Sequence, residues 1–490
     1  MIQAAAARGR LVTARDLTLG SFLPRLAAIH GERTLMTSTA ERLSFAQAAE
    51  RVERWAGAVH AEVTGGSRVV LILEGYDLLL ASLAVSRAGA LPVPINAQMR
   101  PDEVDHVVRD AGAAMVVRDA VELSGASRLV EPVPARASDV AALFYTSGTT
   151  GKPKGVELTH RGLLGASNVA ALFPSGLRHD EAVVALPVAH IYGFTALLGL
   201  AAAGVPVHYL SRFRADDVLD AIEQRRATMF LGVPAMYRLM AEAGASARDL
   251  RSVRVWASGA DVMPEDLAAR FRHMGASASL PVVGHVGDAL FVEGYGMVEL
   301  GGGVALKVGP NLVALPGYRF RVVDDNGREV ALGQVGELWV RGPGTLRGYY
   351  GDAKATADAL TSDGWVRTGD LARRGLGNSV RFSGRKKDVI KHGGYSVYAV
   401  EVEAALTEHP DIVEAAVIGL ADPRKGEVPV AAVRVREGSK VKPAELVAWA
   451  AEHLSDYKAP RQVVIVDELP RTGTTKVQKS GLVDLFDARL

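Results

Sequence analysis

The feature that most limits the fold is an alternation of apolar runs and helical segments between residues 68 and 95. Residues 68–73 read RVVLIL and residues 91–95 read LPVPI, and both are apolar runs of strand length. Between them, Asp77 stands where a helix N-cap is expected, and Gly89 where a helix stop is expected. A strand, a helix and a second strand are typical of a parallel sheet covered by helices. We therefore predict an α/β fold.

The same alternation recurs further along the chain. We predict strands at 182–186, 205–210 and 228–233 and helices at 193–203, 215–226 and 234–243. After about residue 315 the sequence changes to short strands separated by turn residues, among which Asn326-Gly327 is a hairpin-type signal. The tail alternates helices and strands in the manner of one small α+β domain, at 399–408, 412–420, 428–435, 443–454 and 462–466.

Length and composition restrict the class of protein. A chain of 490 residues is too long for one ordinary core, so we predict two domains, at 1–386 and 387–490. The net charge of +1 argues against nucleic acid as a partner, and the lack of cysteine excludes disulfides and thiolate chemistry and fits the cytoplasm. The longest apolar stretch, 195–207, is broken by Gly204 and Pro206 and is too short to span a membrane. Contact with a membrane surface and oligomer formation stay open.

A glycine-rich polar stretch, FYTSGTTGKPKGVELTH at 144–160, follows an apolar run. We predict strands at 141–145 and 155–158 with a loop between them. Glycine permits positive φ, so backbone N–H groups can turn toward one point, and hydroxyl and ammonium groups add donors. Such a loop is suited to hold a polyphosphate. Its residues are Thr146, Ser147, Gly148, Thr149, Thr150, Gly151, Lys152, Pro153 and Lys154.

Two other interpretations of this loop are weaker. A Walker A loop requires Ser or Thr after its lysine to reach Mg²⁺, but Lys152 is followed by Pro153, and the chain continues into a strand. An ordinary exposed turn does not require so long an ordered string of hydroxyls, glycines and lysines. The loop therefore favours phosphate binding of another kind.

The loop resembles the signature loop of the adenylate-forming superfamily, which includes acyl-CoA synthetases, luciferases and nonribosomal-peptide adenylation domains. Further motifs extend the resemblance from about residue 20 to 482. The resemblance implies a large N-terminal domain of layered sheets and helices with a small β-subdomain. It also implies a small, mobile α+β C-terminal domain. Within the superfamily the chain looks most like a fatty acyl-CoA synthetase, an AMP-dependent acid–CoA ligase.

Two later motifs, SGADVMPEDL from Ser258 and EGYGMVE ending at Glu299, match the superfamily's nucleotide site. The resemblance implies that Glu299 holds Mg²⁺, a task that suits a carboxylate. It also implies that the adenine of ATP stacks on the ring of Tyr295, next to Gly296, and that the backbone of Ser258, Gly259 and Ala260 lies against the adenine.

Two departures accompany these motifs. The residue before the acid is Val298, where the superfamily usually has a threonine that reaches the α-phosphate, so one donor is lost. Residues 276–292 form a longer approach to the second motif than we expect, and the sequence offers no account of the extra residues.

The resemblance also implies roles for residues nearer the C-terminus. It places Asp370 and Arg385 on the ribose, and Lys387 at a hinge between the domains. Lys476 matches the catalytic lysine, although Thr475 stands where the superfamily usually has glycine; Lys479 is a weaker candidate. His190, in PVAHIYG, is implied beside the reacting carboxylate, and a packed core histidine is the alternative.

The implied reaction has two steps. A carboxylate attacks the α-phosphate of ATP, with Mg²⁺, to give an acyl-adenylate and pyrophosphate, and catalysis is chiefly positioning and charge neutralisation. The small domain then rotates at Lys387, and CoA takes the acyl group. The resemblance implies that Gly393, Gly394 and Tyr395 face the site in this second step and leave room for the pantetheine arm of CoA.

The acyl substrate is inferred less directly. Small residues flank the expected site at Gly193, Gly199, Ala201–Ala203 and Gly301–Gly303, and missing side-chain volume can leave an apolar channel. This favours a medium- or long-chain fatty acid and a place in lipid metabolism, whereas ordinary close packing is the alternative. A ligase for aryl or other small acids, or one that loads a carrier protein, stays open. So does a catalytically weak homologue that only binds nucleotide or acyl ligand.

Overall fold

The computed structural model describes residues 16–125, 127–147, 153–170, 180–280, 284–471 and 477–486. Its contacts divide the chain into two compact units. Unit 1 comprises residues 1–307, 314–319 and 340–366. Unit 2 comprises residues 308–313, 320–339 and 367–490.

Unit 1 contains the predicted parallel sheets. One sheet has the order β4-β3-β5, with all pairs parallel, from β3 (Arg68–Leu71), β4 (Leu91–Pro94) and β5 (Met115–Val117). Helix α4 (Gly75–Arg87) connects β3 to β4, as the alternation predicts. The neighbouring segments are α2 (Leu19–His30), α3 (Phe45–Glu62), α5 (Pro101–Asp110) and the 3₁₀ turn η1 (Ala120–Leu123).

The predicted start of α4 is wrong. Its N-cap is Glu74, and Asp77 lies in the first turn, 3.6 Å from the Arg51 guanidinium. The turn after β3 is shorter than predicted, and a carboxylate inside the first turn is also favourable for a helix because backbone N–H groups are exposed there. The predicted stop is confirmed, since the helix ends at Arg87 and Gly89 has a φ of +77°.

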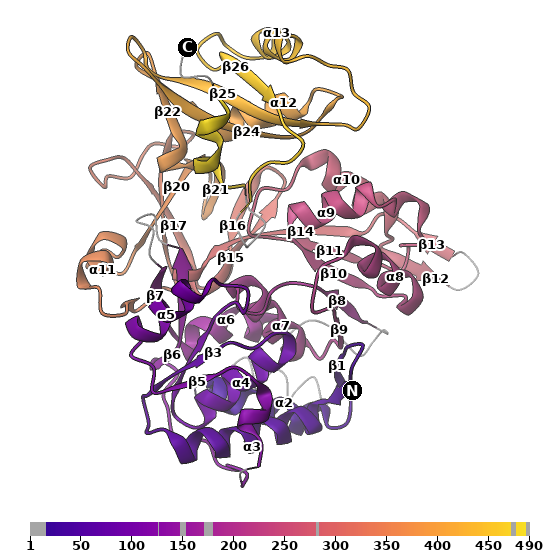
Figure 1. Ribbon diagram of the computed structural model, residues 1–490, viewed down its shortest axis with the longest axis vertical. Coiled ribbons are helices and arrows are strands. Elements are labelled where there is room, and N and C mark those ends of the chain that lie inside the picture. Colours follow the sequence, from indigo (N-terminus) through magenta and orange to yellow (C-terminus); the bar gives the residue numbers. More distant parts are fainter. Residues whose placement is uncertain are drawn as a thin grey trace. The chain divides into compact units, whose positions relative to one another are not determined.

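A second sheet in unit 1 carries most of the remaining strands. Its order is β15-β14-β11-β10-β8-β9-β1-β2, and every pair from β14 to β1 is parallel. The strands are β1 (Thr34–Thr37), β2 (Arg42–Ser44), β8 (Ala182–Val184), β9 (Val207–Tyr209), β10 (Met229–Gly232), β11 (Val255–Ser258), β14 (Leu290–Met297) and β15 (Gly302–Val308). The accompanying helices are α7 (Ile191–Ala203), α8 (Ala215–Arg225), α9 (Pro234–Glu242) and α10 (Glu265–Met274), with the short η2 (Ala245–Ala247) (Figure 1).

Aromatic residues fix the part of this sheet that leads to the site. The rings of Trp256 and Phe271 meet edge to face at 5.1 Å, and Tyr237 packs against Phe271 at 4.9 Å. All three are buried. Because Trp256 lies in β11, this packing holds the strand that ends at Ser258.

The longer approach noted at 276–292 forms a β-hairpin. Strands β12 (Ala278–Leu280) and β13 (Gly284–Val286) pair antiparallel with each other, in a two-stranded sheet of their own. The extra residues therefore add an outlying element rather than lengthen β14.

A third sheet of unit 1 holds the glycine-rich stretch. Strands β6 (Val140–Ser147) and β7 (Pro153–Thr159) form an antiparallel hairpin, and β19 (Gly348–Tyr349) pairs with β7 on its other edge. Helix α6 (His160–Ala170) follows β7 directly, and α11 (Ala353–Ala359) follows β19. The buried imidazole of His160 accepts a hydrogen bond from the Leu19 N–H at 3.1 Å, which ties α6 to α2.

Unit 2 contains the predicted short strands and the tail. Its first sheet has the order β17-β18-β20-β21-β16, from β16 (Asn311–Ala314), β17 (Arg319–Val323), β18 (Val335–Arg341), β20 (Val366–Arg374) and β21 (Ser379–Arg385). The Asn326-Gly327 turn is confirmed: Gly327 has a φ of +76°, and Val323 bridges Glu329 across it. The tail follows as β22 (Val389–His392), β23 (Tyr395–Tyr398), α12 (Ala399–Thr407), β24 (Ile412–Asp422), β25 (Gly426–Val435), α13 (Pro443–His453), β26 (Gln462–Ile465) and η5 (Lys479–Leu485).

The tail has its own hydrophobic core on both faces of the β24–β25 pair. Buried residues of α12, α13 and β26 pack on one face, and Leu469, Leu482 and Phe486 pack on the other. The proposed domain boundary near Lys387 agrees with this separate core. The division by contacts instead groups the preceding strands β16–β18, β20 and β21 with the tail, so the boundary itself stays a prediction.

None of the helices in the described ranges is long and apolar enough to cross a membrane. The apolar stretch at 195–207 ends instead in a left-handed C-cap at Gly204, with a φ of +69°, as the sequence predicts for a buried helix followed by a strand.

Candidate active site

The predicted phosphate loop is the end of the β6–β7 hairpin. The two strands extend further than predicted, so that Thr146 pairs with Lys154 and Ser147 with Pro153. The backbone positions at the base of the loop are therefore fixed by the ladder. The predicted residues Gly148, Thr149, Thr150, Gly151 and Lys152 lie outside the described residues.

Lys154 is held at the base of this hairpin by two neighbours. Its Nζ lies 3.2 Å from Asp352 Oδ2 and 5.7 Å from the centre of the Tyr349 ring. Asp352 also caps α11 by accepting the Ala355 N–H at 2.8 Å. The pKa of Asp352 is lowered by that backbone hydrogen bond first, and then by the hydrogen bond from Lys154. The carboxylate thus remains charged opposite the lysine at neutral pH.

Glu299 lies close to the same tyrosine. It sits in the short η3 turn (Val298–Leu300), and its Oε1 accepts a hydrogen bond from the Tyr349 hydroxyl at 3.0 Å. Its backbone carbonyl accepts the Leu346 N–H at 2.9 Å. Burial, followed by the charge of Glu299, raises the pKa of Tyr349, so the phenol keeps its proton and donates it.

Sequence reasoning missed Tyr349 and Asp352. The available signal was the short GYYGD segment, in which a tyrosine precedes a capping aspartate. Its importance depends on the pairing of β19 with β7, which joins segments far apart in the chain.

The residues here fit an Mg²⁺ ion that arrives with ATP. No group of three or more His, Asp or Glu side chains within the described ranges could hold a metal ion by itself. Mg²⁺ usually keeps several waters and binds through one or two carboxylates together with substrate phosphates. Glu299 supplies one such carboxylate, and it is partly exposed. Its role as the metal ligand stays a prediction.

The two predicted adenine segments run side by side. Strand β11 ends with Ser258 paired parallel to Glu293, and a Cβ on Gly259 would lie 3.6 Å from the Gly294 carbonyl oxygen. Ala260 has a φ of +70°, a left-handed conformation that is strained for alanine by roughly 1–2 kcal/mol. Strain of this kind often marks a ligand-binding turn.

Tyr295 and Gly296 lie in β14 next to this turn, and both are partly exposed. A Cβ on Gly296 would lie 2.0 Å from the Gly302 carbonyl oxygen, so only glycine fits where β14 meets β15. The structure brings the segments of Ser258 and Tyr295 together as adjacent strands. Adenine binding by them stays a prediction.

His190 acts as a helix cap rather than as a packed core residue. It precedes α7, and its Nδ1 accepts the Tyr192 N–H at 3.2 Å. The ring is partly exposed. A role beside the reacting carboxylate stays a prediction.

Tyr192 is a second residue that sequence reasoning missed, although its motif was singled out. Its ring edge lies 3.4 Å from the position of a Cβ on Gly259. Its hydroxyl is enclosed and has no hydrogen-bond partner among the described residues, and the same holds for the hydroxyl of Ser258. Burial raises the pKa of Tyr192, so its hydroxyl is a neutral donor in need of an acceptor.

The small residues expected to leave an acyl channel are in fact largely closely packed. A Cβ on Gly193 would lie 2.2 Å from the Pro187 carbonyl oxygen. A Cβ on Gly301 would meet Gly162 at 3.1 Å, and one on Gly302 would meet Thr195 at 3.0 Å. These three glycines allow close approach of neighbouring segments, and they are not evidence of free volume. A Cβ on Gly199 would make only an ordinary contact, at 3.7 Å, and one on Gly303 would meet no described atom within 4 Å, so the argument for a fatty acid fails at Gly193, Gly301 and Gly302.

In unit 2 the two predicted ribose residues face each other. Asp370 and Arg385 are directly paired across β20 and β21, with Arg385 Nε 3.6 Å from Asp370 Oδ1. The Asp370 N–H donates to Thr368 Oγ1 at 3.1 Å, and Asp370 is buried, with 8% of its surface exposed. A carboxylate and a guanidinium placed together in this way can bind neighbouring hydroxyl groups.

The predicted hinge and CoA loop lie just beyond. Lys387 is exposed in η4 (Lys386–Asp388). Gly393 and Gly394 turn between β22 and β23 with φ of +57° and +86°, and a Cβ on either would meet no atom within 4 Å. Tyr395 is 59% exposed and stacks on Tyr457 at 4.6 Å. The loop is thus open, as a narrow substrate arm requires.

The base of that loop is clamped by residues that the sequence did not single out. His392 is buried and bonds through Nδ1 to the Glu427 carbonyl oxygen at 2.7 Å. The Gly393 N–H donates to the Lys425 carbonyl oxygen at 2.7 Å, and the Lys391 N–H donates to the Glu427 carboxylate at 2.7 Å. Lys476 and Thr475 lie outside the described residues, whereas Lys479 pairs with Glu403 at 2.6 Å.

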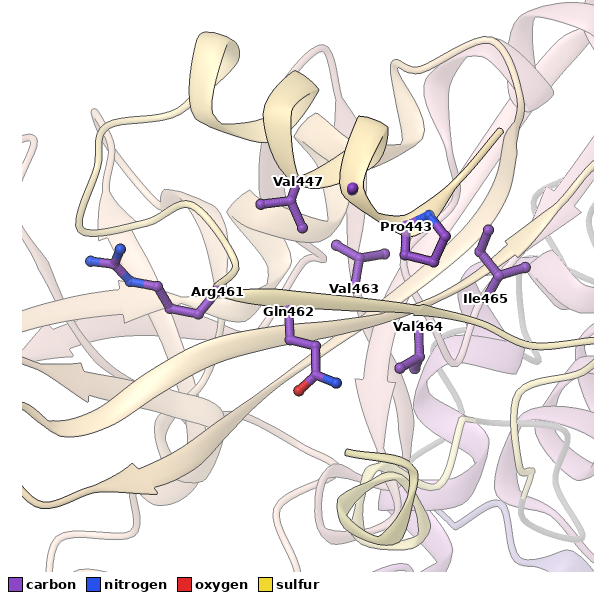
Figure 2. Close-up of a pocket in the computed structure, with 8 residues that line it drawn as sticks. Pro443, Val447, Arg461, Gln462, Val463, Val464 and Ile465 are labelled. Carbon is purple, nitrogen blue, oxygen red and sulfur yellow. The ribbon is translucent and has the colours of Figure 1, made fainter. Parts of the chain in front are cut away.

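A groove of about 590 Å³ lies apart from these residues in the tail (Figure 2). It runs between the first turns of α13 and strand β26, and Figure 2 shows Val463 and Ile465 on the same side of the strand as Val447. None of the predicted site residues that the structure describes lines it. We assign it no part in the reaction.

Comparison with known proteins agrees with this arrangement. The AMP-binding enzyme family matches residues 23–350, and the C-terminal domain of AMP-binding enzymes matches residues 401–476. The chain belongs to the AMP-binding enzyme family. It is 35% identical to a feruloyl-CoA synthase from an Amycolatopsis species, over 95% of this chain and 98% of the relative. It is 31% identical to an indoleacetate–CoA ligase from Aromatoleum aromaticum, over 96% and 98%.

Solved structures of the family are similar throughout. ATP-bound MatB from Rhodopseudomonas palustris superimposes with a TM-score of 0.84 at 27% identity, covering 96% of this chain and 99% of that one. The o-succinylbenzoate-CoA synthetase of Bacillus subtilis with ATP and magnesium gives a TM-score of 0.80 at 26% identity, covering 93% and 98%. The predicted fold class is confirmed. This AMP-binding enzyme is an acid–thiol ligase that uses ATP, Mg²⁺ and CoA.

Proposed function

We propose that this ligase activates an aromatic carboxylic acid and transfers it to CoA. The observation that carries the proposal is that relatives matched over nearly the whole chain are a feruloyl-CoA synthase and an indoleacetate–CoA ligase, both named for aromatic acids. A rice 4-coumarate–CoA ligase, 30% identical over 85% of this chain, supports the same class. The fatty acid expected from the sequence has no such support.

Two features of the structure support an aromatic acid. Close packing at Gly193, Gly301 and Gly302 weakens the argument for a long apolar channel. Tyr192 offers an aromatic ring and an enclosed hydroxyl that has no partner in the part of the chain that the structure describes. A buried donor of this kind is satisfied when a polar ring substituent accepts its hydrogen bond.

The reaction proceeds in two steps. A carboxylate oxygen of the acid forms a bond to the α-phosphorus of ATP, the bond from that phosphorus to pyrophosphate breaks, and an acyl-adenylate results. The thiolate of CoA then bonds to the acyl carbon, and AMP leaves. Lys154 offsets negative charge at the hairpin, and Glu299 would hold the Mg²⁺ that neutralises the phosphates. Lys476, as the lysine that accompanies the attack, belongs to the same proposal.

A panel of acids tests the substrate class. Ferulate, 4-coumarate, cinnamate, indoleacetate, octanoate and palmitate would each be supplied with ATP, Mg²⁺ and CoA. The readouts are pyrophosphate release and product mass. We expect kcat/KM for the best aromatic acid to exceed that for either fatty acid at least about tenfold, a difference of about 1.4 kcal/mol. A fatty acid that matches or exceeds every aromatic acid would contradict the proposal.

The variant Tyr192→Phe sharpens this test. Removing one neutral hydrogen bond of about 1 kcal/mol should lower kcat/KM for 4-coumarate roughly fivefold relative to cinnamate, which lacks the ring hydroxyl. The matched control is Tyr76→Phe, because the Tyr76 hydroxyl is also enclosed, with no partner within the described ranges, but lies among α2, α4 and α7. An equal effect on both acids would show that Tyr192 does not read the ring substituent.

A further inference from the structure

Tyr349 lies between a carboxylate and an ammonium group that the reaction needs. Its hydroxyl donates to Glu299 Oε1 at 3.0 Å, and its ring lies under Lys154 Nζ at 5.7 Å. An aromatic face attracts a cation, and a phenol donates to an acceptor. One side chain therefore fixes both the acid at η3 and the lysine at the hairpin base.

The backbone holds Tyr349 in place from both sides. Tyr349 pairs with Val156 of β7, and the Tyr350 N–H donates to the Gly155 carbonyl oxygen at 2.8 Å. The Tyr349 N–H donates to Thr356 Oγ1, in α11, at 2.9 Å. The backbone of Tyr349 is thus anchored to the strand that carries Lys154 and to the helix capped by Asp352, and the hydrogen bond to Glu299 fixes the direction of the ring.

The hydrogen bond from Tyr349 uses only part of the acceptor capacity of Glu299. A carboxylate has two oxygens with about four lone-pair sites, and Tyr349 occupies one site on Oε1. Groups that hydrogen-bond a metal ligand orient it, and their loss typically weakens metal affinity about 10- to 100-fold. A single carboxylate depends on such support more than a full set of ligands would.

We propose that Tyr349 is a positioning residue for the ATP-dependent step. Its hydroxyl orients Glu299 toward Mg²⁺, and its ring, together with Asp352, holds Lys154 toward the polyphosphate. Metal and lysine thereby act on one ATP from fixed positions. This inference rests on the proposed use of Glu299 for Mg²⁺, and it does not depend on which acid the enzyme takes.

Binding of ATP without acid or CoA tests the inference. Titration calorimetry would give the Kd for ATP with excess Mg²⁺ and with EDTA, in wild type and in Tyr349→Phe. We expect the gain in affinity that Mg²⁺ confers to shrink about tenfold in Tyr349→Phe, while the Kd in EDTA changes less than about twofold. A gain equal to that of wild type would overturn the proposal.

Two further variants keep the test decisive. Tyr350→Phe removes the neighbouring hydroxyl, whereas the hydroxyl that donates to Glu299 belongs to Tyr349. The gain in ATP affinity that Mg²⁺ confers on Tyr350→Phe should therefore equal that of wild type. Asp352→Asn keeps the helix cap but removes the charge opposite Lys154, so it should change the Kd in EDTA more than the Mg²⁺ gain. If Tyr350→Phe loses the gain as Tyr349→Phe does, or if Asp352→Asn changes neither quantity, the assignment is wrong.

The positioning role of Tyr349 and the proposed acid preference can be refuted independently. An acid panel that favours fatty acids would refute the substrate class and leave the Mg²⁺ gain untouched. Normal Mg²⁺-dependent binding in Tyr349→Phe would refute the positioning role and leave the acid preference untouched.

Discussion

The base of the β6–β7 hairpin and the tip of the β22–β23 hairpin both belong to glycine-rich segments that are predicted to bind ligands, but they are built differently. At the first, Lys154 already contacts Asp352 and Tyr349. At the second, a Cβ on Gly393 or Gly394 would meet no atom within 4 Å, and Tyr395 is 59% exposed.

The difference follows from what each turn has to do. Neutralising a polyphosphate requires charges that are fixed before the reaction, because reorganising them would add to the barrier. Admitting a long, narrow acceptor requires space. On the proposed roles, the base of the first hairpin is preorganised and the second turn is open, so variants at the two places should affect different steps.

The largest effect is expected at Glu299, which is joined to the base of the β6–β7 hairpin through Tyr349. Glu299→Gln removes the charge on the proposed metal ligand and should slow acid-dependent ATP–pyrophosphate exchange at least about 100-fold. Glu265→Gln is the control, because Glu265 is an exposed acid in the same unit, with 68% of its side chain accessible. Exchange by Glu299→Gln within about threefold of wild type would remove Glu299 from the site.

A smaller and step-specific effect is expected at the open turn. Gly394 has a φ of +86°, so Gly394→Val both strains the turn and fills it. We expect transfer to CoA to slow roughly tenfold while pyrophosphate exchange without CoA stays within about twofold. Gly438→Val is the control, because Gly438 has a φ of +79° and open space around it, far along the chain. Equal slowing of both steps would contradict the division of labour between the two turns.

The smallest effect on activity is expected from His160, which anchors the end of the rigid hairpin. Burial lowers the pKa of His160 from 6.5 to about 4. Between pH 4 and 6.5, His160 is therefore protonated in the unfolded chain and neutral in the folded chain. Stability from this group is therefore full above pH 6.5 and is lost as pH falls toward 4, by on the order of 3 kcal/mol.

His160→Gln keeps an acceptor for Leu19 but does not titrate. Thermal unfolding of both proteins from pH 4 to 7.5 should show the wild type losing more stability on the acid side, while activity at pH 7 changes less than about twofold. Parallel pH profiles would show that His160 carries no such dependence.

Much of the fold could be predicted because the strands are buried on both faces and so form solid apolar runs, as at 68–71. Helix starts were less certain: Asp77 is a good N-cap by type, yet Glu74 takes that place. The β12–β13 hairpin was not predicted, because its three-residue strands are too short to show a periodic pattern in the sequence.

The site was partly predictable for a similar reason. Motif residues such as Asp370 and Arg385 could be named from a resemblance, and the structure pairs them. Tyr349 could not be found, since its value depends on a long-range strand pairing. Gly193 was misread because a missing side chain can mean empty space or a close approach, and the sequence does not distinguish them.

The central claim is that the braced hairpin and Glu299 together receive the charged end of ATP. A crystal structure with a non-hydrolysable ATP analogue and Mg²⁺ tests it most directly. The account predicts the phosphates against the β6–β7 turn, the metal bonded to Glu299, and the Tyr349–Glu299 hydrogen bond intact. Phosphates bound elsewhere, with Glu299 away from the metal, would contradict it.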